Sequence, residues 1–205
     1  MSLKKLFYIF IFLLSGNAFG DNQVKPNDTL TYQMYSEGVN AEDTKFSSDD
    51  ITVNEKTKVM IATGNVLIIS KDQKINADKV EYNQNTDKAV ATGNVVITNR
   101  NGSIYESENV TLTNEFKSIV AIPLFGKLID KSSIRSKNFM KNDLEESFFN
   151  EGIYTACECN LKKDETPIWR LESKEIKHDP KTQTVYLKHA VMKIFSLPIY
   201  YLPYL

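Results

Sequence analysis

Two cysteines stand one residue apart, at Cys157 and Cys159, and the 205-residue chain contains no other thiol. Two thiols can form a disulfide or contribute to a metal site. A bridge between residues this close is strained, so pairing with a distant or separate cysteine is easier. A metal site needs about four ligands, and His178 and His189 are the only histidines. We treat both cysteines as disulfide candidates and predict no metal site.

The pair His178-Asp179 has the residue types of a general acid–base site. However, Asp before Pro180 is typical of a turn. The sequence contains no serine in a nucleophile motif, no glycine-rich phosphate loop and no supported pair of carboxylates. Trp169 is interpreted as a core residue. We therefore predict that the chain is not an enzyme and requires no cofactor.

Residues 1–20 have the pattern of a secretory signal peptide. Lys4 and Lys5 precede an apolar run from 6 to 14, and Ala18 and Gly20 are small residues of the kind that a signal peptidase reads. A membrane-spanning helix needs about 20 apolar residues, which exceeds the length of this run. We expect the segment to be cleaved and the mature chain to be periplasmic or extracellular, where thiols oxidise.

The charge pattern argues against a nucleic-acid partner. The formal net charge is -1, and the only arginines are Arg100, Arg135 and Arg170. A nucleic-acid-binding protein would carry a basic stripe, which is lacking here.

A five-residue motif, ATGNV, occurs at 62–66 and again at 91–95, 29 residues later. Further matches at the same offset include Ile51 with Val80, Val53 with Tyr82, Asn54 with Asn83, Thr57 with Thr86, and Ile68 with Ile97. These matches indicate an internal repeat of about 29 residues.

Each repeat predicts a β-hairpin, because an alternating strand, a polar turn and a β-branched strand follow one another. Gly64 and Gly93 lie inside the return strands, where glycine indicates a bulge or bend. Fainter copies begin at Val110 and Ile176. Since one hairpin cannot bury its own apolar face, we expect the hairpins to stack. An all-β solenoid, jelly roll or open barrel would fit this pattern.

The expected domain organisation is simple. Residues 21–46 are a flexible polar leader, and residues 47–205 form one continuous stack of strands. Within the stack, the apolar segment 118–128 contains Pro123, which predicts an edge strand or a packed loop.

Strand alternation predicts which side chains face the interior. Val66 and Ile68 share one face with their repeat partners, and the full set is Val53, Val66, Ile68, Tyr82, Val95, Ile97 and Leu112. These residues could form an ordinary filled core or line an interior that stays partly open for an apolar ligand. Periodicity alone leaves both possibilities.

Two blocks of sequence resemble a known family. The ATGNV unit is similar to the OstA-like repeat of the lipopolysaccharide-transport proteins LptA, LptC and LptD. A second block resembles the end of the LptD N-terminal periplasmic domain: Tyr154-Thr155-Ala156-Cys157, Pro167-Ile168-Trp169, His178-Asp179 and Tyr201-Leu202-Pro203-Tyr204. Together the blocks cover residues 49–205.

The resemblance implies an open β-jelly roll of stacked antiparallel hairpins, located in the periplasm at the outer membrane. It implies that the apolar interior, formed by the seven residues named above, binds the lipid A chains of lipopolysaccharide. An LptA-like bridge protein would dock edge to edge with one end. Cys157 matches the family position of a cysteine that is tied by disulfides to a C-terminal barrel.

The chain ends at Leu205, so we expect the C-terminal barrel of LptD to be absent; an LptE-type lipoprotein would be a partner only if a barrel exists. Two alternatives to the LptD-like module remain open. One is a structural or adhesive periplasmic β-solenoid with a filled core, and the other is a stand-alone LptA-like bridge protein.

Overall fold

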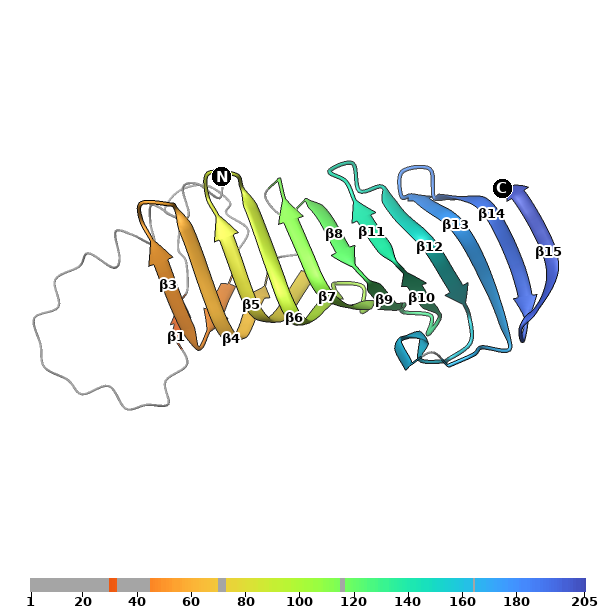
Figure 1. Cartoon of the computed structure of the whole chain (residues 1–205), viewed down its shortest axis with the longest axis horizontal. Coiled ribbons are helices and arrows are strands. Elements are labelled where there is room, and N and C mark those ends of the chain that lie inside the picture. The colour runs from red at the N-terminus through yellow and green to blue at the C-terminus, as the bar shows by residue number, and fades with distance from the viewer. Residues whose placement is uncertain (1–29, 33–44, 70–72, 115–116, 164) are drawn as a thin grey trace, which may run out of the picture.

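The computed structural model describes residues 30–32, 45–69, 73–114, 117–163 and 165–205. These residues form fifteen β-strands, which belong to a single sheet, and one short 3-10 helix, Leu161–Lys163. The strands lie side by side in a long stack that ends at β15 (Figure 1). No helix among the described residues has the length and apolar character that a membrane crossing requires. The expected all-β class is confirmed.

The strands are short at the start of the stack and near its middle, and long elsewhere. In chain order they are β1 Leu30–Tyr32, β2 Lys45–Ser48, β3 Asp50–Asn54, β4 Val59–Ile69, β5 Gln73–Asn83, β6 Lys88–Asn99, β7 Ile104–Thr113, β8 Ser118–Ile122, β9 Leu124–Lys127, β10 Ser133–Ser136, β11 Asn138–Lys141, β12 Ser147–Thr155, β13 Trp169–Asp179, β14 Thr184–Ile194 and β15 Leu197–Tyr204.

Every strand pairing is antiparallel, and most neighbours in the sheet are neighbours in the sequence. The predicted hairpins β3–β4, β5–β6 and β13–β14 are all present. The centre differs, because each half of a long strand there has its own short partner. One half of β7 pairs with β8 and the other with β9, and β12 divides in the same way between β11 and β10. The result is an open β-jelly roll of stacked antiparallel hairpins.

The strands bend where the repeat places its glycines. Gly64 and Gly93 have φ of 74° and 76°, and the strand register shifts beside both. A Cβ on Gly93 would lie 2.4 Å from Oδ2 of Asp78, and one on Gly64 would meet Asp49 in the same way. Only glycine fits both this conformation and this contact.

A buried serine marks the bend on several of the other strands. The hydroxyl of Ser107 donates to the carbonyl oxygen of Asn109 at 3.0 Å, and Ser48, Ser136 and Ser173 likewise donate to the carbonyl two residues ahead. These hydroxyls satisfy carbonyl groups within the buried bend. The bend is therefore a repeated structural element that extends beyond the two ATGNV copies.

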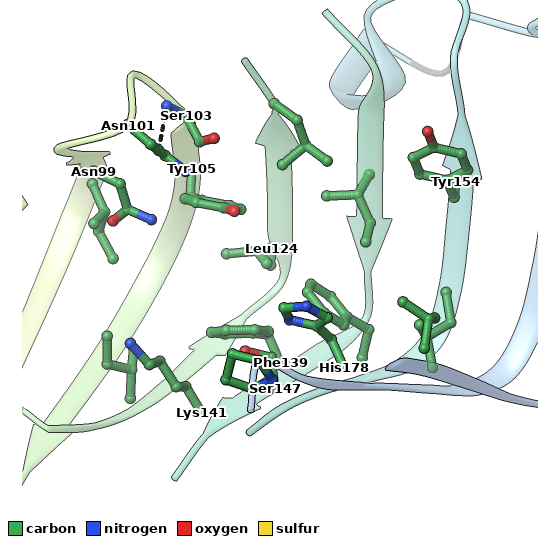
Figure 2. Close-up of a pocket in the computed structure, with 18 of the residues that line it drawn as sticks. Asn99, Asn101, Ser103, Tyr105, Leu124, Phe139, Lys141, Ser147, Tyr154 and His178 are labelled. Carbon is green, nitrogen blue, oxygen red and sulfur yellow. Dashed lines mark hydrogen bonds between the residues drawn. The ribbon is translucent and has the colours of Figure 1, made fainter. Parts of the chain in front are cut away.

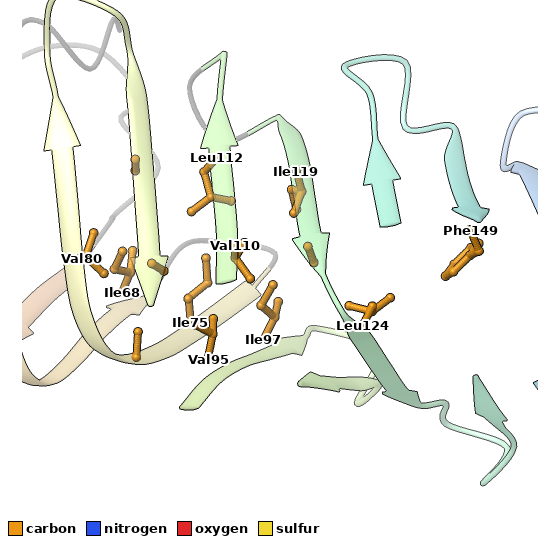
Figure 3. Close-up of a cluster of buried hydrophobic side chains, with 14 of the residues drawn as sticks. Ile68, Ile75, Val80, Val95, Ile97, Val110, Leu112, Ile119, Leu124 and Phe149 are labelled. Carbon is orange, nitrogen blue, oxygen red and sulfur yellow. The ribbon is translucent and has the colours of Figure 1, made fainter. Parts of the chain in front are cut away.

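The bends fold the sheet so that the inward side chains of both halves belong to one hydrophobic core. Figure 3 shows part of this cluster, including Val80, Val95 and Leu112. One row of inward residues crosses the sheet in register: Ile51, Ala62, Val80, Ala91, Val110, Ala121, Phe139, Phe149, Ile176 and Leu187. Alanine alternates with branched residues in the first six positions, and large residues occupy the last four.

The expectation for residues 118–128 is wrong. β8 pairs with β7 and β11, and β9 pairs with β7 and β10, so neither strand is an edge or a loop. Pro123 lies between the two strands, at the bend, where no ladder hydrogen bond needs its missing N–H.

The sheet also begins before the expected boundary at residue 47, because β1 and the start of β2 fall within 21–46. The signal peptide and the remainder of the expected leader lie outside the described residues.

Candidate functional site

A hollow of about 770 Å³ lies between the two halves of the bent sheet. Its wall runs from Gln73 on β5 to Leu187 on β14, and Figure 2 shows the central part of that wall. Most of the side chains in the wall are apolar: Ile97, Tyr105, Ile119, Leu124, Leu128, Ile129, Ile134, Phe139, Phe149, Tyr154, Leu171, Ile176, Val185 and Leu187. The volume is in the range of natural small-molecule sites.

Two glycines allow the wall to pack closely. A Cβ on Gly126 would lie 2.6 Å from Cγ2 of Ile134, and one on Gly152 would lie 2.7 Å from Cδ1 of Ile176. Contacts this short do not occur between real side chains, so Ile134 and Ile176 occupy their positions only because residues 126 and 152 lack side chains.

Aromatic rings form the centre of the wall. Phe139 and Phe149 have ring centroids 4.9 Å apart and tilted by 50°, and Tyr154 packs edge-on against Trp169 at 6.2 Å. Burial raises the pKa of Tyr105, against the smaller lowering effect of a hydrogen bond with Ser103. The shift indicates that this part of the wall is poorly solvated. The site therefore favours an apolar ligand.

The two ends of the hollow carry different polar groups. Asn99, Asn101, Ser103 and Asp130 lie at one end, where the amide of Ser103 donates to Oδ1 of Asn101 at 2.9 Å (Figure 2). Hydrogen bonds from the side chain and backbone of Ser132 lower the pKa of Asp130, so this end has a carboxylate.

Lys141, Glu145, Ser147 and His178 lie at the other end of the hollow. Lys141 is in register with Ser147, which is in register with His178, so three neighbouring strands place these side chains side by side. This end therefore offers a cation, an acidic side chain and two other hydrogen-bonding groups.

The seven residues that the sequence analysis assigned to the interior all lie on the first half of the stack. Val66, Ile68, Tyr82, Val95, Ile97 and Leu112 are buried, and Val53 on β3 is half-buried. Of the seven, Ile97 lines the hollow. The other five buried residues belong to the packed core beside it, and Val53 lies outside that core, so a lipid-binding role for these six stays a prediction.

Both cysteines lie in the loop between β12 and the 3-10 helix. They are free and half-buried, and the hydroxyl of Ser133 donates to the carbonyl of Cys159 at 3.0 Å. Their predicted pairing has no partner among the described residues, and it stays a prediction. No group of three or more histidine, cysteine or acidic side chains in the described part of the chain is arranged to hold a metal ion.

Sequence reasoning missed most of the wall, including Phe139, Phe149, Tyr154 and Ile176. A signal was available for Phe139 and Ile176. A small residue followed three positions later by an apolar one occurs at Ser48/Ile51, Ala77/Val80, Ser107/Val110, Ser136/Phe139 and Ser173/Ile176. This pattern identifies the inward row on both sides of the hollow.

A family model described as "LptA/(LptD N-terminal domain) LPS transport protein" matches residues 45–194. No curated protein matches the chain. Among solved structures, the chain is similar to LptH, the LptA homologous periplasmic component of the lipopolysaccharide transport device from Pseudomonas aeruginosa. The two are 11% identical, the match covers 75% of this chain and 95% of LptH, and the TM-score is 0.31. A TM-score this low supports no further conclusion.

Proposed function

We infer, because the chain belongs to the LptA and LptD N-terminal domain family of lipopolysaccharide transport proteins, that its hollow shields the acyl chains of lipopolysaccharide during transport. The observation that carries this proposal is the apolar hollow between the two halves of the sheet. It has a volume suited to acyl chains and a wall of aliphatic and aromatic side chains. The proposal places the protein in the periplasm, at the outer membrane.

The energetic reason is the cost of exposing acyl chains to water. Burial of one methylene is worth about 0.8 kcal/mol, so ten methylenes left in water cost roughly 8 kcal/mol. A carrier that crosses an aqueous compartment must therefore keep the chains in an apolar interior. The wall from Ile97 to Leu187 supports such a role, because its apolar side chains come from many successive strands.

A structural or adhesive solenoid was the alternative from sequence. Such a protein gains from a filled core, since empty apolar volume destabilises the fold. A hollow of about 770 Å³ beside a well-packed core favours the carrier.

Docking to a partner of the same fold is the second part of the proposal. Among the described residues, β3 pairs only with β4, so one side of β3 is left without a strand neighbour. An edge strand of this kind can accept another strand through main-chain hydrogen bonds. We propose an LptA-like protein as that partner; an LptE-type partner stays a prediction.

The carrier proposal is tested by photocrosslinking in cells that make lipopolysaccharide. A photoreactive residue at Ile97 or Phe149 should capture lipopolysaccharide, because both side chains line the hollow. The matched control is Val120, which is exposed and lies on β8 without lining the hollow. Equal capture from Val120, or none from Ile97 and Phe149, would refute the proposal.

The docking proposal has a separate test. A photoreactive residue at Thr52 on β3 should crosslink to an LptA-like protein, whereas one at Leu144, in the turn after β11, should not. Equal labelling from both positions would contradict docking at β3.

A further inference from the structure

A single row of inward residues changes from apolar to polar as it reaches the hollow. In register across β4 to β8 the row reads Met60, Tyr82, Ala89, Leu112 and Ile119. Across β11 to β13 it continues with half-buried Lys141 and Ser147 and with exposed His178, and Val185 follows on β14. Polar residues at positions that the fold elsewhere fills with apolar side chains are a common sign of function.

The charges around the hollow are unevenly distributed. Among the described residues of its wall, Lys141 is the only lysine or arginine. It is half-buried, and its neighbours in register are Ile119 on β8 and Ser147 on β12. The opposite end has amides and the carboxylate of Asp130. Lys141 therefore attracts an anionic group to its own end, where Glu145 is the one opposing charge, whereas the other end has Asp130 and no cation in the wall.

We propose that Lys141, with Ser147 and His178 beside it, binds the phosphate of an amphiphile whose acyl chains occupy the hollow. This inference rests on the proposed function and adds the residues that recognise the head group. A lysine ammonium forms charge-assisted hydrogen bonds with phosphate oxygens, and a neighbouring serine hydroxyl is a further donor. Binding at this end fixes the orientation of the ligand, with the head group at Lys141 and the chains toward Phe139 and Phe149.

Glu145 is the one acidic side chain at the same end, and it is exposed in the turn after β11. Its charge opposes the binding of an anion. Water and salt screen a charge at such a position, so its effect should be small. Removal of this charge should therefore strengthen phosphate binding slightly, whereas removal of the Lys141 charge should weaken it.

The test uses isothermal titration calorimetry of the full chain with two amphiphiles below their micelle concentrations. Dodecyl phosphate and the uncharged dodecyl glucoside share one alkyl chain and differ in the head group. At low salt the phosphate should bind about tenfold more tightly, as one charge-assisted contact provides. In Lys141→Met this preference should vanish while dodecyl glucoside affinity is unchanged. Lys141→Gln is a second variant, in case the first folds poorly.

Three controls make the outcome specific. Lys174→Met removes an exposed lysine that does not line the hollow, and it should keep the tenfold preference. Glu145→Gln should increase the preference by about twofold. Inorganic phosphate alone should not bind measurably, because the chains supply most of the affinity; tight binding of free phosphate would overturn a lipid head-group site.

The same titrations separate the two proposals. If dodecyl glucoside binds but dodecyl phosphate binds no more tightly, or if both Lys141 variants keep the preference, the head-group inference is wrong and the carrier proposal stands. If neither amphiphile binds, both are refuted.

Discussion

Asn94 and Asp78 lie 16 residues apart in the chain, and Nδ2 of Asn94 donates a hydrogen bond of 2.9 Å to Oδ2 of Asp78. Asn65 donates to Asp49 in the same way, at 2.8 Å. Both asparagines have positive φ and follow a glycine at a strand bend. The shared geometry of the two copies shows that the ATGNV motif is a folding element, which bends the strand and fixes the bend to its neighbour.

Substitution of Gly93 by alanine should destabilise the fold by roughly 2 kcal/mol or more, because positive φ costs about 1–2 kcal/mol and the new Cβ meets Asp78. Gly102→Ala is the matched control, since Gly102 has φ of 89° but a Cβ added there would meet no atom within 4 Å. Urea unfolding measures both variants. An equal loss in the two would show that the contact with Asp78 has no influence.

The two cysteines should differ in reactivity. Hydrogen bonds with the Thr155 side chain and the backbone of Trp169 lower the pKa of Cys157, whereas burial and the neighbouring Cys157 raise the pKa of Cys159. As the pH rises, Cys157 should become a thiolate first and react first. Iodoacetamide alkylation of Cys159→Ser, which keeps Cys157, should therefore reach its half-maximal rate at lower pH than that of Cys157→Ser. The reverse order would contradict the assignment.

Glu172 should contribute stability that is lost in acid. Burial raises the pKa of Glu172. Hydrogen bonds from Lys193 and Arg170, each 2.7 Å long, together lower this pKa by more than burial raises it, so the net shift is downward. A lowered pKa in the folded state stabilises the protein above the unfolded value of about 4.3, and the contribution disappears as the pH falls through the folded value. The gap in unfolding free energy between wild type and Glu172→Gln should thus be larger at pH 7 than at pH 3.

If the difference in unfolding free energy between wild type and Glu172→Gln were the same at pH 7 and pH 3, the ionised state of Glu172 would not contribute to stability. Glu158→Gln is a suitable control, because Glu158 is exposed and its contact with Lys131 is 3.8 Å long, so its gap should be small at both pH values.

The C-terminal strand should cause self-association at high concentration. β15 pairs only with β14 among the described residues, and its apolar side chains are exposed, including Ile199 at 58%. A lysine on an edge strand opposes further pairing. Ile199→Lys should shift sedimentation toward the monomer, whereas Leu144→Lys, at 53% exposure in a turn, should not. Equal effects would indicate a general effect of charge.

The sequence predicted the hairpins well where the repeat is strong. Ile51 and Val53 begin a strand, Gly64 and Gly93 mark bends, and the inward alternation from Val66 to Ile97 is correct. These features are local, because the period of two and the requirement for positive φ can be read from a few residues.

The hollow could not be predicted in the same way. Its wall depends on the distance between two halves of a bent sheet, which no local pattern encodes. Phe139 and Phe149 reach the same row as Ala121 because β11 pairs with β8 on one side and with β12 on the other. Pro123 shows the same limit: its break in the local strand pattern predicts an edge strand or a packed loop, whereas the structure has a junction between two paired strands there.

The 29-residue spacing of the bends also has a consequence for size. Each additional hairpin contributes two strands, and adjacent strands are about 4.8 Å apart, so one more unit would lengthen the molecule by roughly 10 Å. Gene duplication of a single unit would extend its reach in fixed increments without any new architecture. Reach of this kind is a property that natural selection, or a protein engineer, can adjust one hairpin at a time.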